Sequence, residues 1–118
     1  ALPSGLDDSG LSRDPAVIDA YRQDPLVHDK ASFELAKDGA AAAAWALAHA
    51  GDFTLPLLMV HGSDDQIAYS AGTEEFASQI EGDVTVTIYE GLLHEPHNEP
   101  EQDEVLADIV EWLDAHVT

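Results

Sequence analysis

Two short polar segments carry the residues best suited to acid–base chemistry. Asp64 and Asp65 follow an apolar run that ends at Val60, and His94 follows a second apolar run that ends at Tyr89. Histidine suits general-base work near neutral pH. A carboxylate bonded to its other ring nitrogen fixes the tautomer and stabilises the imidazolium. The pattern therefore predicts an acid–base pair, and spacing alone does not choose between Asp64 and Asp65.

Other histidines are expected to have structural roles. His49 and His116 lie near the C-terminal ends of expected helices, where the helix dipole favours a cation. His61 closes the first apolar run and is expected to hydrogen-bond the backbone.

A metal site is the alternative use of the second polar segment. His94 and His97 could act as ligands together with Glu95 or Glu99. Pro96 makes a helical ligand pair unfavourable, however. The chain has no cysteine, which excludes thiolate sites. We therefore expect neither a metal nor a cofactor.

Hydrophobic periodicity indicates the elements that position these segments. Residues 55–60 form a near-continuous apolar run, typical of a strand buried on both faces. Residues 84–89 alternate β-branched side chains and predict a second strand. A helix capped by Ser70 is expected over 70–80. An amphipathic helix is expected over 101–116, with a buried face made of Val105, Leu106, Ile109, Val110, Trp112 and Leu113.

Alternation of strands and helices implies a parallel sheet with covering helices. Functional groups of such sheets gather beyond the C-terminal ends of the strands, where both polar segments lie. Two strands are too few for a stable sheet. We therefore expect further strands, either from a larger sheet or from another chain.

The N-terminal third is expected to be loop and helix. Residues 1–13 are rich in Gly, Ser, Pro and Asp, which predicts a loop. Asp14 and Pro15 predict the start of a short helix over 14–22. An alanine-rich stretch predicts a longer helix over 32–49 with Ser32 as its cap.

The charge of the chain is unusual: 24 Asp and Glu against 4 Lys and Arg give a formal net charge of −20. Nucleic-acid binding requires a basic surface, and anionic membranes would repel this chain, so neither partner is expected. The segment around Asp7 and Asp8 lacks the ligand spacing of an EF-hand. We interpret the acidity as adaptation to high salt, which screens self-repulsion.

Targeting signals are not visible in the sequence. No apolar run approaches the roughly 20 residues of a membrane span, and no signal peptide is recognisable. A cytoplasmic protein is expected. The chain does not begin with Met, so we expect its true N-terminus to lie upstream.

Three segments resemble the α/β-hydrolase superfamily, and within it the monoacylglycerol lipase and lysophospholipase group. They are residues 56–67, which read PLLMVHGSDDQI, residues 86–95, which read VTIYEGLLHE, and residues 97–99, which read HNE. Residues 12–15 and 24–28 are similar to the stretch that leads through the cap of that family. The departure is Gln66, where the family usually has Arg.

The resemblance implies the C-terminal part of an α/β-hydrolase sheet, its last two parallel strands with flanking helices, preceded by cap-type helices. It implies a cap segment over 1–52 and a core portion over 53–118. It assigns the triad acid to Asp65 and the base to His94. Substrate contacts are expected from Phe33, Trp45 and Ile67.

The nucleophile of this family lies on a Gly-x-Ser-x-Gly turn that precedes the acid and the histidine. No such pentapeptide occurs in the sequence. We therefore expect the chain to be part of a serine ester hydrolase acting on monoacylglycerol-like lipid esters, with the N-terminal half as its partner, and expect the chain alone to be inactive. The alternative is a non-catalytic α/β module that forms homo-oligomers and keeps the two triad residues as relics.

Overall fold

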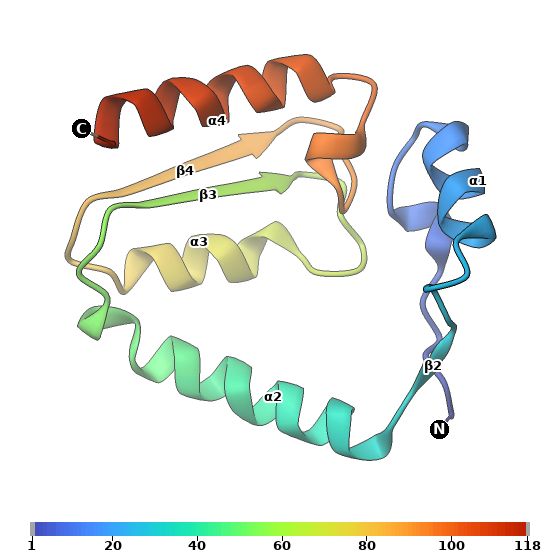
Figure 1. Cartoon of the computed structure of the whole chain (residues 1–118). Coiled ribbons are helices and arrows are strands. Elements are labelled where there is room, and N and C mark those ends of the chain that lie inside the picture. The colour runs from blue at the N-terminus through green and yellow to red at the C-terminus, as the bar shows by residue number, and fades with distance from the viewer. Residues whose placement is uncertain (1, 118) are drawn as a thin grey trace.

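Two parallel strands form the centre of the C-terminal half. In the computed structural model, which describes residues 2–117, β3 (Leu57–Gly62) pairs in parallel with β4 (Val84–Tyr89), first residue opposite first residue. The connecting helix α3 (Ser70–Ser78) lies on one face of this pair, and α4 (Gln102–His116) covers the other (Figure 1). The predicted order and the parallel pairing are confirmed.

Two element boundaries differ from the prediction. β3 begins at Leu57 and continues to Gly62 rather than covering 55–60. Pro56 has no backbone N–H to donate, and the first ladder bond is donated by Leu57 N to the carbonyl of Asp83 at 2.9 Å. In α3, Ser70 is the first helical residue rather than the cap, and the N-cap position is held by Tyr69 without a side-chain cap bond.

The core between the strands and α4 is small. Tyr89, Leu92 and Val105 are buried together, and Val60 and Ile109 pack against them. Burial raises the pKa of the Tyr89 phenol, and so does its hydrogen bond, donated at 2.8 Å to an Asp108 carboxylate oxygen.

Only part of the expected face of α4 is buried. Val105 is fully buried, whereas Leu106, Val110 and Leu113 are 45%, 54% and 43% exposed. α4 packs on one side of a sheet only two strands wide. Half of the residues on this expected face are therefore only partly covered by other parts of residues 2–117.

The N-terminal part forms an arm that contains β1 (Leu2–Pro3), the 3-10 turn η1 (Asp8–Gly10), α1 (Pro15–Gln23), β2 (Lys30–Ala31), α2 (Phe33–Ala48) and the 3-10 turn η2 (Ala50–Asp52). The arm passes beside the site end of the sheet at η1 and α1 and ends at the opposite end, where β3 begins (Figure 1). β1 lies in the stretch 1–13 that was predicted as loop, and it pairs antiparallel with β2. The predicted caps Asp14 and Ser32 accept hydrogen bonds from helix backbone N–H groups, as their sequence positions predicted.

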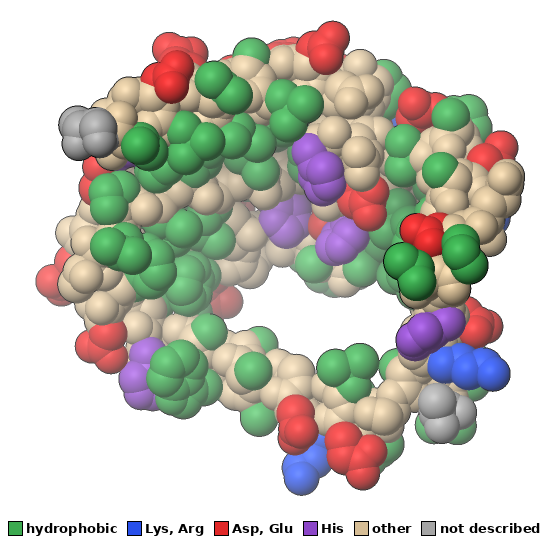
Figure 2. Space-filling model, viewed as in Figure 1, with side chains coloured by type: hydrophobic (Ala, Val, Ile, Leu, Met, Phe, Trp, Pro, Cys, Tyr) green, Lys and Arg blue, Asp and Glu red, His purple; other side chains and the backbone are tan. Residues whose placement is uncertain are grey.

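The molecule is more open than a chain of this length usually is. Its radius of gyration is 16.0 Å, against about 13.5 Å for a compact chain of its length. Its accessible surface is 8049 Å², against roughly 6200 Å² for a compact protein of its mass. Figure 2 shows an opening through the molecule, between α2 and the part that contains the sheet. No residue of α2 is buried, and no helix within 2–117 is long and apolar enough to cross a membrane.

We predict that salt stabilises this chain. The Debye length falls from roughly 30 Å at 0.01 M salt to roughly 3 Å at 1 M, so repulsion among a net charge of −20 weakens. Circular dichroism should show a melting temperature that rises steadily from low ionic strength to molar sodium chloride.

The control changes the exposed acids Asp103, Glu104 and Glu111 of α4 to their amides. This variant should show a smaller rise, because less charge remains to be screened. Equal melting temperatures of the natural chain at both salt levels would contradict the salt-adaptation interpretation.

Candidate active site

Asp65 lies in the turn that follows β3 and is 1% exposed. Its Oδ1 accepts hydrogen bonds from the backbone N–H groups of Ile67 at 2.8 Å and Ala68 at 3.0 Å. These bonds fold the turn around the carboxylate and direct Oδ2 toward the loop that follows β4.

His94 lies in that second loop, and its Nδ1 is 2.8 Å from Asp65 Oδ2. An ionised carboxylate only accepts hydrogen bonds, so Nδ1 of His94 donates. In the neutral ring this leaves Nε2 without a proton, and no hydrogen bond within residues 2–117 occupies it. The side chain is 35% exposed. His94 therefore presents a free basic nitrogen at an accessible position.

His61, the penultimate residue of β3, is a second imidazole on the same carboxylate. Its Nε2 lies 2.9 Å from Asp65 Oδ2 and 2.6 Å from the carbonyl oxygen of Ala68. Both are acceptors, so Nε2 donates, and Nδ1 accepts from the Thr73 hydroxyl of α3 at 2.8 Å. The backbone bond was predicted, but the contact with Asp65 was missed. The only feature of the sequence that could have indicated this contact is a histidine at a strand end, four residues before an aspartate.

The pKa of Asp65 reflects opposing effects. Burial by itself raises the pKa of this carboxyl group. The hydrogen bonds from Ala68 N, from the His94 ring and from Ile67 N together outweigh burial and hold the pKa below the usual value of 3.8. The Asp65 carboxylate is therefore ionised at neutral pH.

Gly62 allows the two loops to meet. A Cβ atom at this position would lie 2.2 Å from the carbonyl oxygens of both Leu92 and Leu93. The loops are also joined by bonds from Asp64 N to the Leu92 carbonyl at 3.0 Å and from Gly91 N to the Ser63 hydroxyl at 2.8 Å. The β3 end can approach the histidine loop this closely only because residue 62 has no side chain.

Of the remaining candidates, Asp64 and Ile67 lie in the same turn as Asp65, whereas Phe33 and Trp45 lie on α2. Asp64 and His97 are exposed, and no group of three or more His, Asp or Glu side chains among residues 2–117 is arranged to hold a metal ion. Ile67 is partly buried beside Gly10. Phe33 and Trp45 are 75% and 63% exposed on α2.

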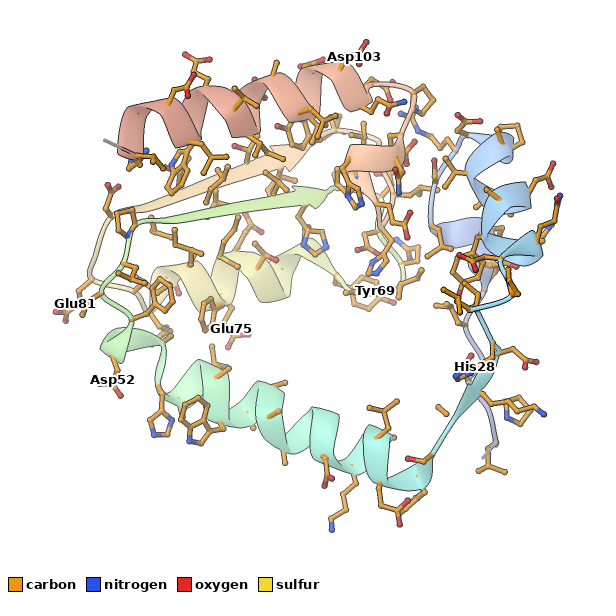
Figure 3. All side chains as sticks on the ribbon, in the orientation of Figure 1. His28, Asp52, Tyr69, Glu75, Glu81 and Asp103 are labelled. Carbon is orange, nitrogen blue, oxygen red and sulfur yellow. The ribbon has the colours of Figure 1, made fainter. Side chains whose placement is uncertain are left out.

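α2 lies across the opening of Figure 2 from the part that contains the sheet, and histidine side chains gather at the rim of this opening. Tyr69, at the start of α3, lies on the sheet side of the same opening (Figure 3) and is 67% exposed. Trp45 lines a shallow hollow with Phe53 and Phe76. Of the three expected substrate contacts, Ile67 thus lies next to Asp65, whereas Phe33 and Trp45 lie on α2. Their role stays a prediction.

Two parallel strands, each followed by a loop that carries one partner of a hydrogen-bonded Asp–His pair, form the C-terminal part of an α/β-hydrolase fold. A family model described as serine aminopeptidase, S33, matches residues 1–101. The chain belongs to this family.

Curated relatives include two lipases. The chain is 38% identical over 114 residues to a monoacylglycerol lipase of Mycolicibacterium smegmatis, covering 95% of this chain and 41% of that protein. It is 32% identical over 116 residues to a putative monoglyceride lipase of Schizosaccharomyces pombe, covering 96% of this chain and 31% of that protein. The chain thus spans less than half the length of these relatives.

The chain is also similar to the solved structures of two lipases. The crystal structure of Paleococcus ferrophilus monoacylglycerol lipase superposes with a TM-score of 0.94 at 32% identity, over 98% of this chain and 46% of that one. A soluble variant of monoglyceride lipase from Saccharomyces cerevisiae, bound to a substrate analog, superposes with a TM-score of 0.83 at 26% identity, over 98% and 44%. The match extends along nearly the whole chain, including the open arm.

We predict that Gly62→Ala destabilises the protein. The added methyl group meets two backbone carbonyls, which cannot rotate away, so we expect a loss of about 3 kcal/mol in the free energy of unfolding. Denaturant unfolding measures this loss.

Gly39→Ala is the matched control, because Gly39 lies inside α2 with open space around it. Here the better helix propensity of alanine should raise stability by up to about 1 kcal/mol. Equal stability of Gly62→Ala and the natural chain would show that the loops do not need this close approach.

We also predict a pH effect that belongs to Asp65. Its pKa is lowered on folding, so its ionised form adds stability that is complete above the usual value of 3.8 and is lost as pH falls through the lower folded value. Between about pH 5 and pH 2, the natural chain should therefore lose stability more steeply than Asp65→Asn.

Unfolding curves at a series of pH values measure the difference, and Asp64→Asn controls for the loss of one negative charge at this turn. Parallel pH profiles of the natural chain and Asp65→Asn would contradict the prediction.

Proposed function

We propose that this chain supplies the acid and the base of a serine ester hydrolase that acts on monoacylglycerols or similar lipid esters. The observation that carries the proposal is the 2.8 Å bond between Asp65 Oδ2 and His94 Nδ1, which leaves Nε2 accessible. The relatives support the substrate class, since two of the curated ones are a monoacylglycerol lipase and a putative monoglyceride lipase.

In the proposed reaction a serine hydroxyl attacks the ester carbonyl. His94 Nε2 accepts the hydroxyl proton and then gives it to the departing alcohol. Asp65 holds the ring in the Nδ1–H tautomer and stabilises the imidazolium, and His61 donates to the same carboxylate oxygen and holds it in place. The sequence contains no nucleophile turn, so the serine is proposed to come from a segment outside these 118 residues.

The chain is proposed to divide into a core portion and a cap segment. Residues 53–118 are proposed to form the core portion with the two loops, and residues 1–52 a cap segment and linker. Exposed Phe33 and Trp45 on α2 are proposed to face the acyl chain of the substrate across the opening. Apolar side chains that are solvated in this chain would then be desolvated by substrate and by the rest of the enzyme.

The test is hydrolysis of a monoacylglycerol by these residues joined to the nucleophile-bearing segment. His94→Gln should lower kcat by about 10⁴- to 10⁶-fold, because the serine loses its base. His97→Gln, which changes an exposed histidine three residues away, should retain normal activity.

The isolated chain should hydrolyse neither a monoacylglycerol nor a short p-nitrophenyl ester. Hydrolysis by the isolated chain would contradict the proposed external nucleophile. Absence of hydrolysis in both forms would favour a non-catalytic module, and cleavage of an aminoacyl p-nitroanilide instead of the ester would move the substrate class to peptides.

A further inference from the structure

Glu99 is a buried carboxylate outside the Asp65–His94 pair. Its side chain is 0% exposed, and a charge so far from water is costly unless the protein meets its hydrogen-bonding capacity. Both of its oxygens are occupied. Oε1 accepts from Leu93 N at 2.8 Å, and Oε2 accepts from Arg13 N at 3.1 Å and from Arg13 Nε at 3.0 Å.

The first of these contacts reaches the residue directly before His94. The next two backbone amides are also bound, because His94 N donates to the Gly10 carbonyl at 3.3 Å and Glu95 N donates to the Leu11 carbonyl at 2.9 Å. Three successive amides around the base thus have three separate acceptors, and only the one from Glu99 is charged.

The second contact ties this acceptor to a distant part of the chain. Arg13 lies 86 residues before Glu99 and also pairs with Glu101. The Ser12 hydroxyl donates to the carbonyl of Asn98 at 2.8 Å, so this segment and the histidine loop run side by side. Arg13 is one of only four Lys and Arg residues in the chain, and its guanidinium lies at the base loop.

We propose that Glu99 is a positioning residue for the base: by binding Leu93 N and Arg13 at once, it fixes the backbone from which His94 extends toward Asp65. The inference rests on the proposed function, in which His94 accepts the proton of the nucleophile. Glu99 does not touch the substrate, and its effect is transmitted through the orientation of the imidazole.

The decisive variant is Glu99→Gln in the protein that carries the nucleophile segment. A glutamine cannot accept at Leu93 and at both Arg13 donors, because one of its two terminal atoms is an amide nitrogen. We expect kcat to fall by about 10- to 100-fold, the effect of misplacing a reacting group by up to an ångström. KM should change less than twofold, because the acyl-binding surface is untouched.

Glu101→Gln is the matched control. It removes the same charge and also faces Arg13, but it binds no amide of the base loop and its side chain is 41% exposed. Its kcat should equal that of the natural protein. Should Glu99→Gln not fold, Glu99→Asp decides instead, since it keeps the charge for Arg13 while withdrawing the oxygen from Leu93, and it should also lower kcat at constant KM.

A second readout does not depend on hydrolysis. The proton between His94 Nδ1 and Asp65 should give a downfield ¹H NMR resonance in the natural protein that shifts or broadens in Glu99→Gln and stays in place in Glu101→Gln. If the natural protein hydrolyses nothing, the proposed function fails while this resonance still tests Glu99. Unchanged kcat and an unchanged resonance in Glu99→Gln and Glu99→Asp would overturn the inference.

Discussion

The site is organised by the need to satisfy a carboxylate that is almost completely removed from water. Burial alone would favour the neutral form of Asp65, and two backbone amides and two imidazoles provide the donors that keep it ionised. Each donor requires a specific local structure. The amides require the tight turn after β3, and His61 requires both β3 and the Thr73 contact to α3. His94 requires that the loop after β4 come within bonding distance, which the missing side chain at Gly62 permits.

The N-terminal arm also holds the histidine loop in place. Its segment 10–13 provides two carbonyl acceptors and an arginine to the histidine loop, so the loop is held by Asp65 on one side and by the arm on the other. The rest of the arm is open. α2 buries no residue, and half of the apolar stripe of α4 is exposed. A two-stranded sheet with such faces leaves apolar surface exposed among residues 2–117.

Much of this arrangement could be predicted from the sequence. Apolar periodicity predicted the parallel strands and their helices, and the position of polar residues after each strand predicted that an acid and a histidine meet. Spacing alone did not choose between Asp64 and Asp65. The resemblance favoured Asp65, which is the one that bonds to His94 in the structure.

The remaining features depend on contacts that local patterns do not encode. Glu99 and Arg13 are 86 residues apart, and nothing near either residue indicates the ion pair. The sequence indicated only that His61 lies at the end of a strand. Its contact with Asp65 could not be predicted, because it depends on how the following turn folds. The periodicity of α4 marked a face that is apolar, but whether that face is buried depends on the width of the sheet. The position of α2, which carries Phe33 and Trp45, across the opening from the sheet could not be predicted either, because helical propensity does not specify where a helix lies.

The central claim is that Asp65 holds His94 as the Nδ1–H tautomer with a free Nε2. The ¹⁵N chemical shifts of the His94 ring at neutral pH test this claim most directly. The structure predicts a protonated Nδ1 and an unprotonated Nε2, with this preference lost in Asp65→Asn. A protonated Nε2 together with an unprotonated Nδ1 in the natural protein would contradict it, because in the orientation of the structure that ring could not donate to the carboxylate and would have no free Nε2.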